Sequence, residues 1–327
     1  MEKLYILAEK EEYTGWGVCV INLYNSLQKF CKPILIKPEK KVVLDAPVFV
    51  PIVTHNLKPL YDIQAPIIVG YGFWEWELQT SAADYAKRYK WIFAGSRWSA
   101  KKILKVTTNC SVLLQGVNLE QFKIEPYPER EGFRVFSGGK FEFRKGQDIV
   151  IAVMRELMAK YPDILLVTSW FNLWPKTERT MEESVLIDVD EPLRGLPLDR
   201  VFQKKILPNN MMSGLYGQTD IGLFPNRGEG GTNLVMMEYM ASGRPVIASY
   251  ATGQKDILQG DGPIKIVKGI YDEKDWFHAN LSTIYQALEE AYCNKEINRK
   301  NGLFCRKLVE PHTWDVAAEN IVKTVFN

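Results

Sequence analysis

Three cationic side chains stand close together in the segment 136–148, FSGGKFEFRKGQD, at Lys140, Arg144 and Lys145. The segment reads as a strand, a pair of glycines and the start of a helix. Because the helix dipole disfavours positive charge at a helix N-terminus, three cations are unfavourable there unless they meet an anion. We therefore predict that they bind a diphosphate group. The alternative is a basic loop that is simply exposed to solvent.

A second segment with the same order of strand, glycines and helix covers residues 223–247, LFPNRGEGGTNLVMMEYMASGRPVI. A glycine-rich turn before a helix lets backbone N–H groups approach phosphate oxygens, and the helix dipole favours their negative charge. The amides predicted to cradle a diphosphate are those of Gly231, Thr232, Asn233 and Leu234. Glu238 follows about one helical turn deeper, at a distance that suits a ribose diol. The alternative is a glycine turn that serves only strand–helix packing.

Both segments lie between a predicted strand and a predicted helix. Along the whole chain, such strands and helices alternate in two successive series. The first series is expected to contain strand 3–8, a glycine turn at 14–17, helix 17–30, short apolar runs at 33–36, 42–44 and 47–53, strand 66–70, helix 81–89, strand 91–94 and helix 99–105. The second is expected to contain strand 133–137, helix 146–160, strand 164–169, a polar stretch 171–200, helix 210–217, strand 220–224, helix 233–241 and strand 244–248. This alternation predicts an α/β protein of two doubly wound domains that face each other across a cleft.

A polar segment with two prolines, between residues 119 and 132, separates the two series and reads as a linker. We place the N-terminal domain at 1–125 and the C-terminal domain at 126–312. The last segment, 313–327, opens with a threonine cap and continues as an amphipathic helix.

Composition indicates a globular protein without a metal site. Of the 327 residues, 46% are hydrophobic and 24% are charged, which excludes a disordered chain. No apolar run is long enough to span a membrane, and charges flank the short N-terminal apolar run, so a secretory signal is not expected. The five cysteines form no C-x-x-C pair and there are only three histidines, which argues against a zinc site or a disulfide framework. Asp188-Val-Asp190 lies in the polar stretch and is not assigned to a metal. We expect a cytoplasmic protein.

Basic residues also gather between positions 87 and 105, although the net charge of the chain is only +2. Seven basic side chains and no acidic one occur there: Lys87, Arg88, Lys90, Arg97, Lys101, Lys102 and Lys105. A solvated helix face is the simpler interpretation. The alternative is a contact surface for an anionic membrane or a nucleic acid.

The second half of the chain resembles the retaining glycosyltransferases of family 4 (glycosyl transferases group 1). The resemblance lies in GGKFEFRKGQDIVIAVMREL, in LYGQTDIGLFPNRGEGGTNLVMMEYMASGRPVIASYATG and in LQGVNLEQF at 114–122, which is similar to the family's p-x-G-V-D-x-x-x-F. TWDVAAENIV is similar to the family's closing helix, which returns to the N-terminal domain. The resemblance implies the GT-B fold of two Rossmann-like domains, with a nucleotide diphosphate sugar as donor.

The resemblance also assigns roles to the charged residues. It implies that Lys140 and Lys145 hold the donor diphosphate, although arginine is more common at the first position, and that Glu238 binds the ribose. A further glutamate of the family lies near the transferred sugar. Here Gly230 stands at the expected spacing, and Glu229 is one position away. We expect Glu229 to face the donor sugar and, with Lys145 and Lys140, to form the catalytic group.

The N-terminal domain departs from most relatives, which carry a histidine after the strand equivalent to 66–70. This chain reads GYGFWEWELQTS there, similar to a subset of the family with a W-E-L motif. Glu77 or Glu75 is expected at the acceptor or donor sugar, and Trp74 and Trp76 are candidates to stack on a sugar. The alternative is an aromatic segment that only packs. His55 is expected to be structural.

Gly15 and Gly17 are expected to approach the donor phosphate from the other domain. The function that follows from the resemblance is a retaining, metal-independent transfer of a sugar from a nucleotide diphosphate sugar, with no cofactor. The donor base is expected near residues 170–174 and 202–210, but neither base, sugar nor acceptor follows from the sequence. The alternatives are a nucleotide-sugar-binding pseudoenzyme, a transferase acting on modified DNA bases, and a transferase that docks on anionic lipid to reach a lipid-linked acceptor.

Overall fold

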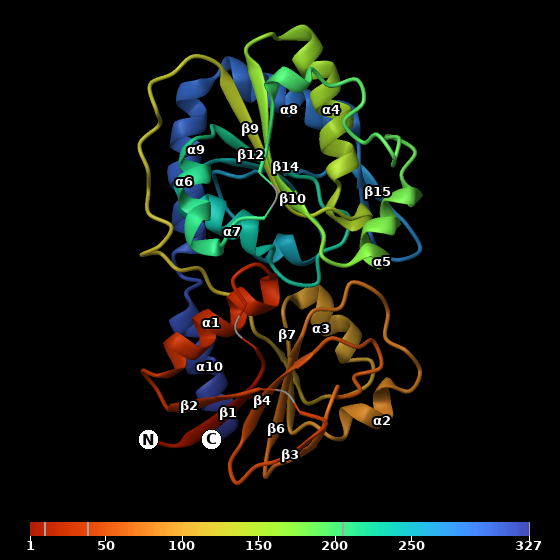
Figure 1. Cartoon of the computed structure of the whole chain (residues 1–327), viewed down its shortest axis with the longest axis vertical. Helices are drawn as coiled ribbons and strands as arrows, with labels where there is room; N and C mark the ends of the chain where they lie inside the picture. Colours follow the sequence, from red (N-terminus) through yellow and green to blue (C-terminus); the bar gives the residue numbers. More distant parts are fainter. Residues whose placement is uncertain (10, 38, 205, 327) are drawn as a thin grey trace. The chain divides into compact units, whose positions relative to one another are not determined.

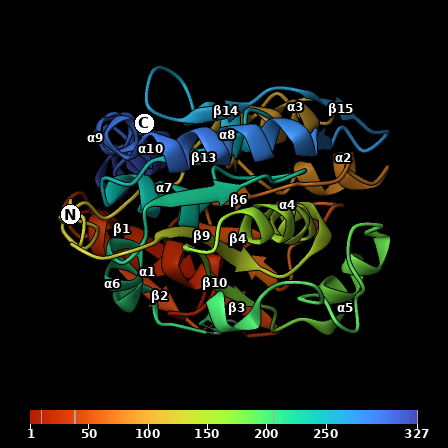
Figure 2. The same cartoon turned by 90° about the horizontal axis from the view of Figure 1, so that it is seen from above.

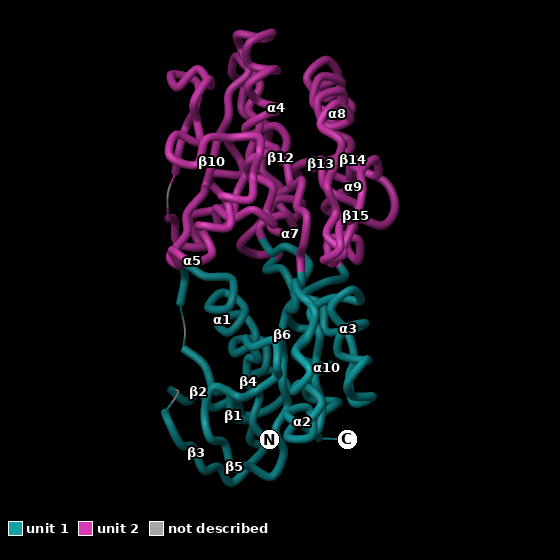
Figure 3. Tube along the Cα trace, turned by 90° about the vertical axis from the view of Figure 1, so that its right-hand side faces the viewer, with its two compact units in different colours: residues 1–118, 230–234, 311–327 teal, residues 119–229, 235–310 magenta. Residues whose placement is uncertain are grey.

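A computed structural model describes residues 1–9, 11–37, 39–204 and 206–326 of the chain. The chain falls into two compact units (Figure 3). Unit 1 comprises residues 1–118, 230–234 and 311–327, and unit 2 comprises residues 119–229 and 235–310. Asn327, the last residue of the expected C-terminal helix, and Lys205, in the segment expected near the donor base, lie outside the described residues.

Unit 1 is built on a six-stranded sheet whose neighbouring strands are all parallel. Its strands are, in spatial order, β2 (Lys32–Ile36), β1 (Lys3–Leu7), β4 (Val48–Ile52), β6 (Ile68–Gly72), β7 (Trp91–Ala94) and β8 (Cys110–Val112). The strands are short apolar runs, as expected of parallel strands that are covered on both faces. Their order reverses between β1 and β4, which makes the carboxyl ends of these strands a place where ligands commonly bind.

Helices cover both faces of this sheet. On one face, α1 (Gly15–Leu27) packs against α10 (Trp314–Phe326), and the two lie side by side in Figure 1. The other face is covered by α2 (Ala82–Ala86), by α3 (Arg97–Ile103) and by the small parallel pair β3 (Lys41–Val43) and β5 (Asp62–Gln64). The last helix of the chain is therefore part of the hydrophobic core of unit 1.

Unit 2 repeats the plan with a second six-stranded parallel sheet. Its spatial order is β11 (Val201–Gln203), β10 (Ile164–Phe171), β9 (Phe133–Lys140), β12 (Ile221–Phe224), β13 (Val246–Ser249) and β14 (Ile264–Ile266). The order reverses at β9, which lies between β10 and β12. The loops after β9 and β12 therefore leave the sheet at the reversal point.

Two groups of helices sandwich the second sheet. One face is covered by α4 (Gln147–Lys160) and α8 (Leu281–Cys293), which run alongside each other in Figure 2. The other face is covered by α6 (Met212–Gly217) and α7 (Leu234–Ala241), which meet the sheet through the aromatic rings of Phe136, Tyr216, Phe224 and Tyr239. Helix α9 (Lys295–Val309) packs against α8, and β15 (Gly269–Tyr271) and β16 (Phe277–Ala279) form a hairpin.

These two sheets confirm the predicted fold class of doubly wound, Rossmann-like α/β units. The structure corrects several elements. The glycine turn expected at 14–17 is the first turn of α1, and the Thr14 hydroxyl caps it by accepting a hydrogen bond from the Gly17 amide at 3.1 Å. The polar stretch 171–200 is not a single loop, because it contains α5 (Pro175–Glu178) and short 3-10 turns. Helices α8 and α9 were not expected.

No helix among the described residues has both the length and the apolar character needed to span a bilayer.

Candidate functional site

The cationic segment leaves the sheet at the carboxyl end of β9. Lys140 is the last residue of that strand, and Arg144 and Lys145 lie in a 3-10 turn, Phe143–Lys145, just before α4. Gly146 joins the turn to α4 with a φ of 73°, which is the left-handed region that glycine adopts readily. A β-carbon at this position would also collide with the carbonyl of Pro225. The backbone thus fixes the three cations at the reversal point of the sheet.

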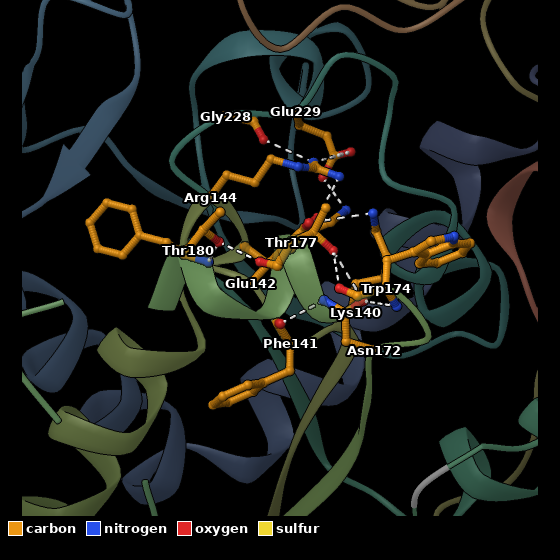
Figure 4. A network of polar contacts seen from close by, with 12 residues as sticks. Lys140, Phe141, Glu142, Arg144, Asn172, Trp174, Thr177, Thr180, Gly228 and Glu229 are labelled. Atoms are coloured by element: carbon orange, nitrogen blue, oxygen red, sulfur yellow. Dashed lines mark hydrogen bonds and ion pairs between the residues drawn. The ribbon is translucent and has the colours of Figure 1, made fainter. Parts of the chain in front are cut away.

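Charges of opposite sign alternate through this segment (Figure 4). The Lys140 ammonium lies 3.3 Å from a Glu142 oxygen, and the other Glu142 oxygen lies 2.6 Å from the Arg144 guanidinium. Arg144 also lies 3.4 Å from Glu229, whose second oxygen is 2.5 Å from the Lys145 ammonium. Glu142, Arg144 and Glu229 are buried. Since buried charges must be paired, the two carboxylates stabilise the cations in this arrangement.

Glu229 is held from several directions in the loop after β12. Its carboxylate accepts a hydrogen bond from the Asn226 amide at 2.8 Å, and its backbone N–H donates to the Thr252 hydroxyl at 3.1 Å. Burial by itself raises the pKa of Glu229. Attraction to Lys145 and Arg144, with hydrogen bonds from Lys145 and Asn226, outweighs this and lowers the pKa below its ordinary value. Glu229 is therefore an ionised, fixed carboxylate at neutral pH.

A buried ion pair joins the first turn of α4 to the loop after β12. Two nitrogens of Arg227 donate to the two carboxylate oxygens of Asp148, at 2.8 and 2.7 Å, and one of them also donates to the Phe143 carbonyl at 2.6 Å. The Arg227 guanidinium also lies 3.8 Å from the centre of the Phe143 ring. This bidentate pair holds the 3-10 turn against the loop that carries Glu229.

Sequence reasoning missed Glu142, Asp148 and Arg227. Glu142 had a usable signal, because it stands two residues from Lys140 and two from Arg144 and so separates two cations. Asp148 and Arg227 lie 79 positions apart, and nothing local in the sequence couples them.

Glu238 lies on α7 and is buried in unit 2. The Asn209 amide donates to one carboxylate oxygen at 2.7 Å, and the Tyr216 hydroxyl donates to the other at 3.0 Å. Burial raises the pKa of Glu238 to about 7, although these two hydrogen bonds favour the ionised form. The carboxyl group is thus poised to gain or lose a proton near neutral pH.

The glycine segment Gly230–Leu234 belongs to unit 1. The Ser96 hydroxyl donates to the Gly230 carbonyl at 2.7 Å, and the Thr232 amide donates to the Gln115 side chain at 3.4 Å. Asn233 has a positive φ of 66°, and α7 begins at the next residue, Leu234. The predicted position of these residues at the start of a helix is confirmed, and their contact with a diphosphate stays a prediction.

Gly15 and Gly17 both lie in the first turn of α1. A β-carbon on Gly17 would collide with the backbone of Glu11, so close packing is a sufficient reason for this glycine. Nothing lies within 4 Å of the β-carbon position of Gly15, which leaves room on that side of the turn.

Trp74 does not present its ring for stacking, contrary to one of the two interpretations of the sequence. Its side chain is 1% exposed in the core of unit 1 and its indole N–H donates to the Thr54 carbonyl at 3.2 Å. The ring fits there because Gly72 has no side chain; a β-carbon on that glycine would meet the indole at 2.4–2.5 Å. The packing alternative therefore describes Trp74.

The other members of this segment are closer to the surface. Trp76 is half-buried and meets the His55 ring edge-on, with 5.4 Å between ring centres. Burial lowers the pKa of His55, while neighbouring Glu75 acts in the opposite direction. Glu77 is exposed and lies 2.7 Å from the Lys105 ammonium.

Three of the seven basic side chains in the run 87–105 are paired with carboxylates, and a fourth is buried. Lys87 pairs with Asp84 and Arg88 with Asp62, while Lys105 is the partner of Glu77. Lys102 is buried and points at the Trp98 ring and the Trp74 carbonyl rather than at solvent. These pairs favour the interpretation as a solvated helix face.

A pocket of about 480 Å³ opens at the carboxyl ends of β9, β10 and β11. Phe141, Trp170 and Phe171 contribute aromatic walls, and Asn172 and Gln203 contribute amide groups. Phe141 directly follows Lys140, so the pocket adjoins the cationic segment. Among the described residues, no group of three or more histidine, cysteine, aspartate or glutamate side chains is placed to hold a metal ion.

Residues 133–286 match the family model described as Glycosyl transferases group 1. No curated protein matches the chain in sequence. Among solved structures, sucrose-phosphate synthase from Thermosynechococcus elongatus is 14% identical, with a TM-score of 0.71 over 99% of this chain and 98% of the other.

Two further structures show the same fold over almost the whole chain. HepE from Anabaena, solved with UDP and glucose, is 12% identical, with a TM-score of 0.72 over 99% of each chain. A glycosyltransferase from Rickettsia africae is 13% identical, with a TM-score of 0.71 over 100% of this chain and 99% of the other. The GT-B fold is thereby confirmed for this chain.

Proposed function

We propose that the protein transfers a glycosyl group from a nucleoside diphosphate sugar to an acceptor hydroxyl, with retention of configuration and without a metal ion. The observation that carries this proposal is the alternating series of Lys140, Glu142, Arg144, Glu229 and Lys145 at the reversal point of a Rossmann-like sheet. The glycosyl transferases group 1 domain and the complexes of HepE with UDP and with UDP-glucose support it.

The three cations are proposed to bind the diphosphate of the donor. Lys140 and Lys145 are positioned by ion pairs, so little rearrangement is needed when phosphate oxygens arrive. As the bond between the sugar and the diphosphate breaks, negative charge grows on the leaving group, and fixed ammonium and guanidinium groups stabilise that charge. In this proposal the cations perform the task that a divalent ion performs elsewhere.

Glu229 is proposed to lie beside the transferred sugar. In the free protein it neutralises Lys145 and Arg144. When a diphosphate neutralises these two cations instead, the ionised carboxylate can accept hydrogen bonds from sugar hydroxyls. It can also stabilise the positive charge that develops at the anomeric carbon. The bond from this carbon to the phosphate oxygen breaks, a bond to the acceptor oxygen forms on the same face, and the acceptor proton passes to the departing diphosphate.

Glu238 is proposed to accept hydrogen bonds from the donor ribose. Hydrogen bonds from Asn209 and Tyr216 fix its carboxyl group. Because burial disfavours the ionised carboxylate, two further hydrogen bonds from ribose hydroxyls would stabilise that form. The pocket between Trp170 and Gln203 also contains the charged side chains of Glu178, Glu191 and Arg194, and its aromatic walls and amide groups are the part proposed to receive the nucleobase.

The amides of Gly231, Thr232, Asn233 and Leu234 and the first turn of α1, with Gly15 and Gly17, are proposed as further phosphate contacts, because both stand at helix N-termini. The acceptor is an unidentified hydroxyl compound. Glu75, Trp76 and Glu77 are candidates to contact it, and the cytoplasm is the proposed location.

A thermal-shift screen with UDP, GDP, ADP and their sugars tests the proposal first, since a ligand that binds only the folded protein raises its stability. The nucleotide sugar that stabilises the protein is then incubated with an acceptor panel, and the anomeric configuration of the product is read by NMR with EDTA present. Binding followed by retained configuration supports the proposal. Binding without any transfer or hydrolysis indicates a nucleotide-sugar-binding pseudoenzyme, and no binding of any nucleotide diphosphate contradicts the proposal.

A further inference from the structure

The segment that follows β10 is tied to the cationic segment by polar side chains (Figure 4). The Asn172 amide donates to the Phe141 carbonyl at 3.0 Å, and the Phe143 amide donates to the Thr180 hydroxyl at 3.1 Å. These two hydrogen bonds meet the backbone on either side of Glu142. The segment 172–180 therefore fixes the backbone that carries the proposed diphosphate ligands.

Asn172 also determines where Trp174 stands. The Asn172 side-chain oxygen accepts hydrogen bonds from the Trp174 amide at 2.9 Å and from the Thr177 hydroxyl at 3.1 Å. Helix α5 starts directly after Trp174 with Pro175, whose fixed φ suits the first helical position. The backbone of Trp174 is thus held on both sides, yet this residue is 43% exposed.

The Trp174 ring lies beside the Lys140 ammonium, with 5.0 Å from the nitrogen to the ring centre. The ring face attracts a cation at this distance. Glu142 also attracts Lys140, at 3.3 Å, but a carboxylate repels phosphate and competes with it for the ammonium. The ring carries no net charge, so it can hold the ammonium in place while the ammonium binds an anion.

We propose that Trp174 is a positioning residue for Lys140, which keeps the ammonium directed at the donor diphosphate. This inference rests on the proposed function, because it assigns a partner to one of the proposed diphosphate ligands. A free lysine side chain samples many rotamers, and restricting them before the ligand binds lowers the entropic cost of binding.

Binding of inorganic pyrophosphate, measured by calorimetry, tests the inference independently of the donor base. The variants are Trp174→Leu, Trp174→Phe, Lys140→Met and the double variant of Trp174→Leu with Lys140→Met. Leu173→Ala is the matched control, since Leu173 is 44% exposed in the same segment. Thermal unfolding of each variant checks that the fold is intact.

We expect Trp174→Leu to weaken pyrophosphate binding about threefold to tenfold, as the usual strength of a cation–ring contact implies. Trp174→Phe, which keeps a ring, and Leu173→Ala should each stay within about twofold of the unchanged protein. In the Lys140→Met background, Trp174→Leu should have no further effect, because the ring then has no ammonium to hold.

An equal loss of affinity from Trp174→Leu with and without Lys140 would overturn the inference, since Trp174 would then contact the ligand or support the fold. Unchanged affinity in Trp174→Leu would overturn it as well, while leaving the proposed function intact. If the unchanged protein does not bind pyrophosphate at all, the proposed diphosphate site itself is contradicted.

Discussion

The loop after β9 in unit 2 and the loop after β6 in unit 1 both leave the carboxyl end of a parallel strand, but they are built differently. The loop after β9 places three cations, of which Arg144 is buried, in one series of ion pairs with the buried carboxylates of Glu142 and Glu229. The loop after β6 places a large aromatic ring, Trp74, in the core and leaves Glu77 at the surface. Charges that are expensive to bury indicate a site whose chemistry needs them, whereas a buried ring is sufficiently explained by packing.

The largest expected effect concerns the ion pair that supports the charged loop. Arg227→Met leaves Asp148 buried without its partner and should lower the free energy of unfolding by about 3–5 kcal/mol. Urea unfolding followed by circular dichroism measures this. The double variant of Arg227→Met with Asp148→Leu removes both charges and should recover much of the loss. A single variant as stable as the unchanged protein would show that solvent reaches Asp148.

Lys145→Ala should reduce kcat/KM by about 10²–10³-fold, the usual cost of removing one group that stabilises charge in the transition state. Steady-state kinetics with the donor found by the thermal-shift screen provide the measurement. Lys105→Ala is the matched control, because Lys105 also pairs with a glutamate but lies in the exposed basic run of unit 1. An equal loss of kcat/KM in both variants would show that the cations after β9 are no more important for activity than an exposed lysine of unit 1.

Glu238 predicts a pH dependence with a definite sign. Its folded-state pKa, raised to about 7, exceeds the unfolded value, so its contribution to stability is complete below about pH 4.5 and is lost as the pH rises through about 7. The expected loss is about 3 kcal/mol. Donor affinity should rise over the same interval, because ribose hydroxyls donate to the ionised carboxylate.

Unfolding and nucleotide-binding titrations between pH 5 and 8 test both trends, and Glu238→Gln should flatten both curves. The depressed pKa of Glu229 has the opposite sign, so its contribution is lost only as the pH falls below about 4.5, outside this interval. Donor binding that is independent of pH would contradict the ribose role.

The smallest effect is expected at the surface of unit 1. Glu77→Gln breaks an exposed ion pair with Lys105 and should change the free energy of unfolding by less than about 1 kcal/mol. Donor affinity should not change. A rise in the acceptor KM without any change in donor affinity would assign Glu77 to acceptor binding and give the loop after β6 a function of its own.

Local patterns in the sequence predicted much of the site. Glycines between a strand and a helix located both loops of unit 2, and the spacing of Lys140 and Lys145 identified the cationic segment. Glu229 and Lys145, 84 positions apart, form an ion pair that sequence reasoning did not predict.

What could not be predicted depends on contacts between distant segments. Trp74 and Trp76 look equivalent in sequence, but the absence of a side chain at Gly72 leaves room for the Trp74 ring in the core, and this contact cannot be read from the local pattern. Asp62, Glu77 and Asp84 pair with members of the basic run but lie outside it in sequence. Counting the charges within the run therefore overstated the positive charge at this surface. Helix α8 could have been found, because Ile284, Leu288 and Ala291 repeat at helical spacing and form its buried face.

The placement of α10 in unit 1 has a consequence for the order of folding during synthesis. Trp314, Ala318 and Ile321 share a hydrophobic cluster with Leu4 and Val69, which are translated almost a whole chain earlier. The hydrophobic core on this face of the first sheet is therefore incomplete until α10 emerges from the ribosome, when nearly all of unit 2 has already been synthesised. A nascent chain of this protein holds an uncovered apolar surface until α10 has been synthesised, and that interval is when a chaperone has the most to protect.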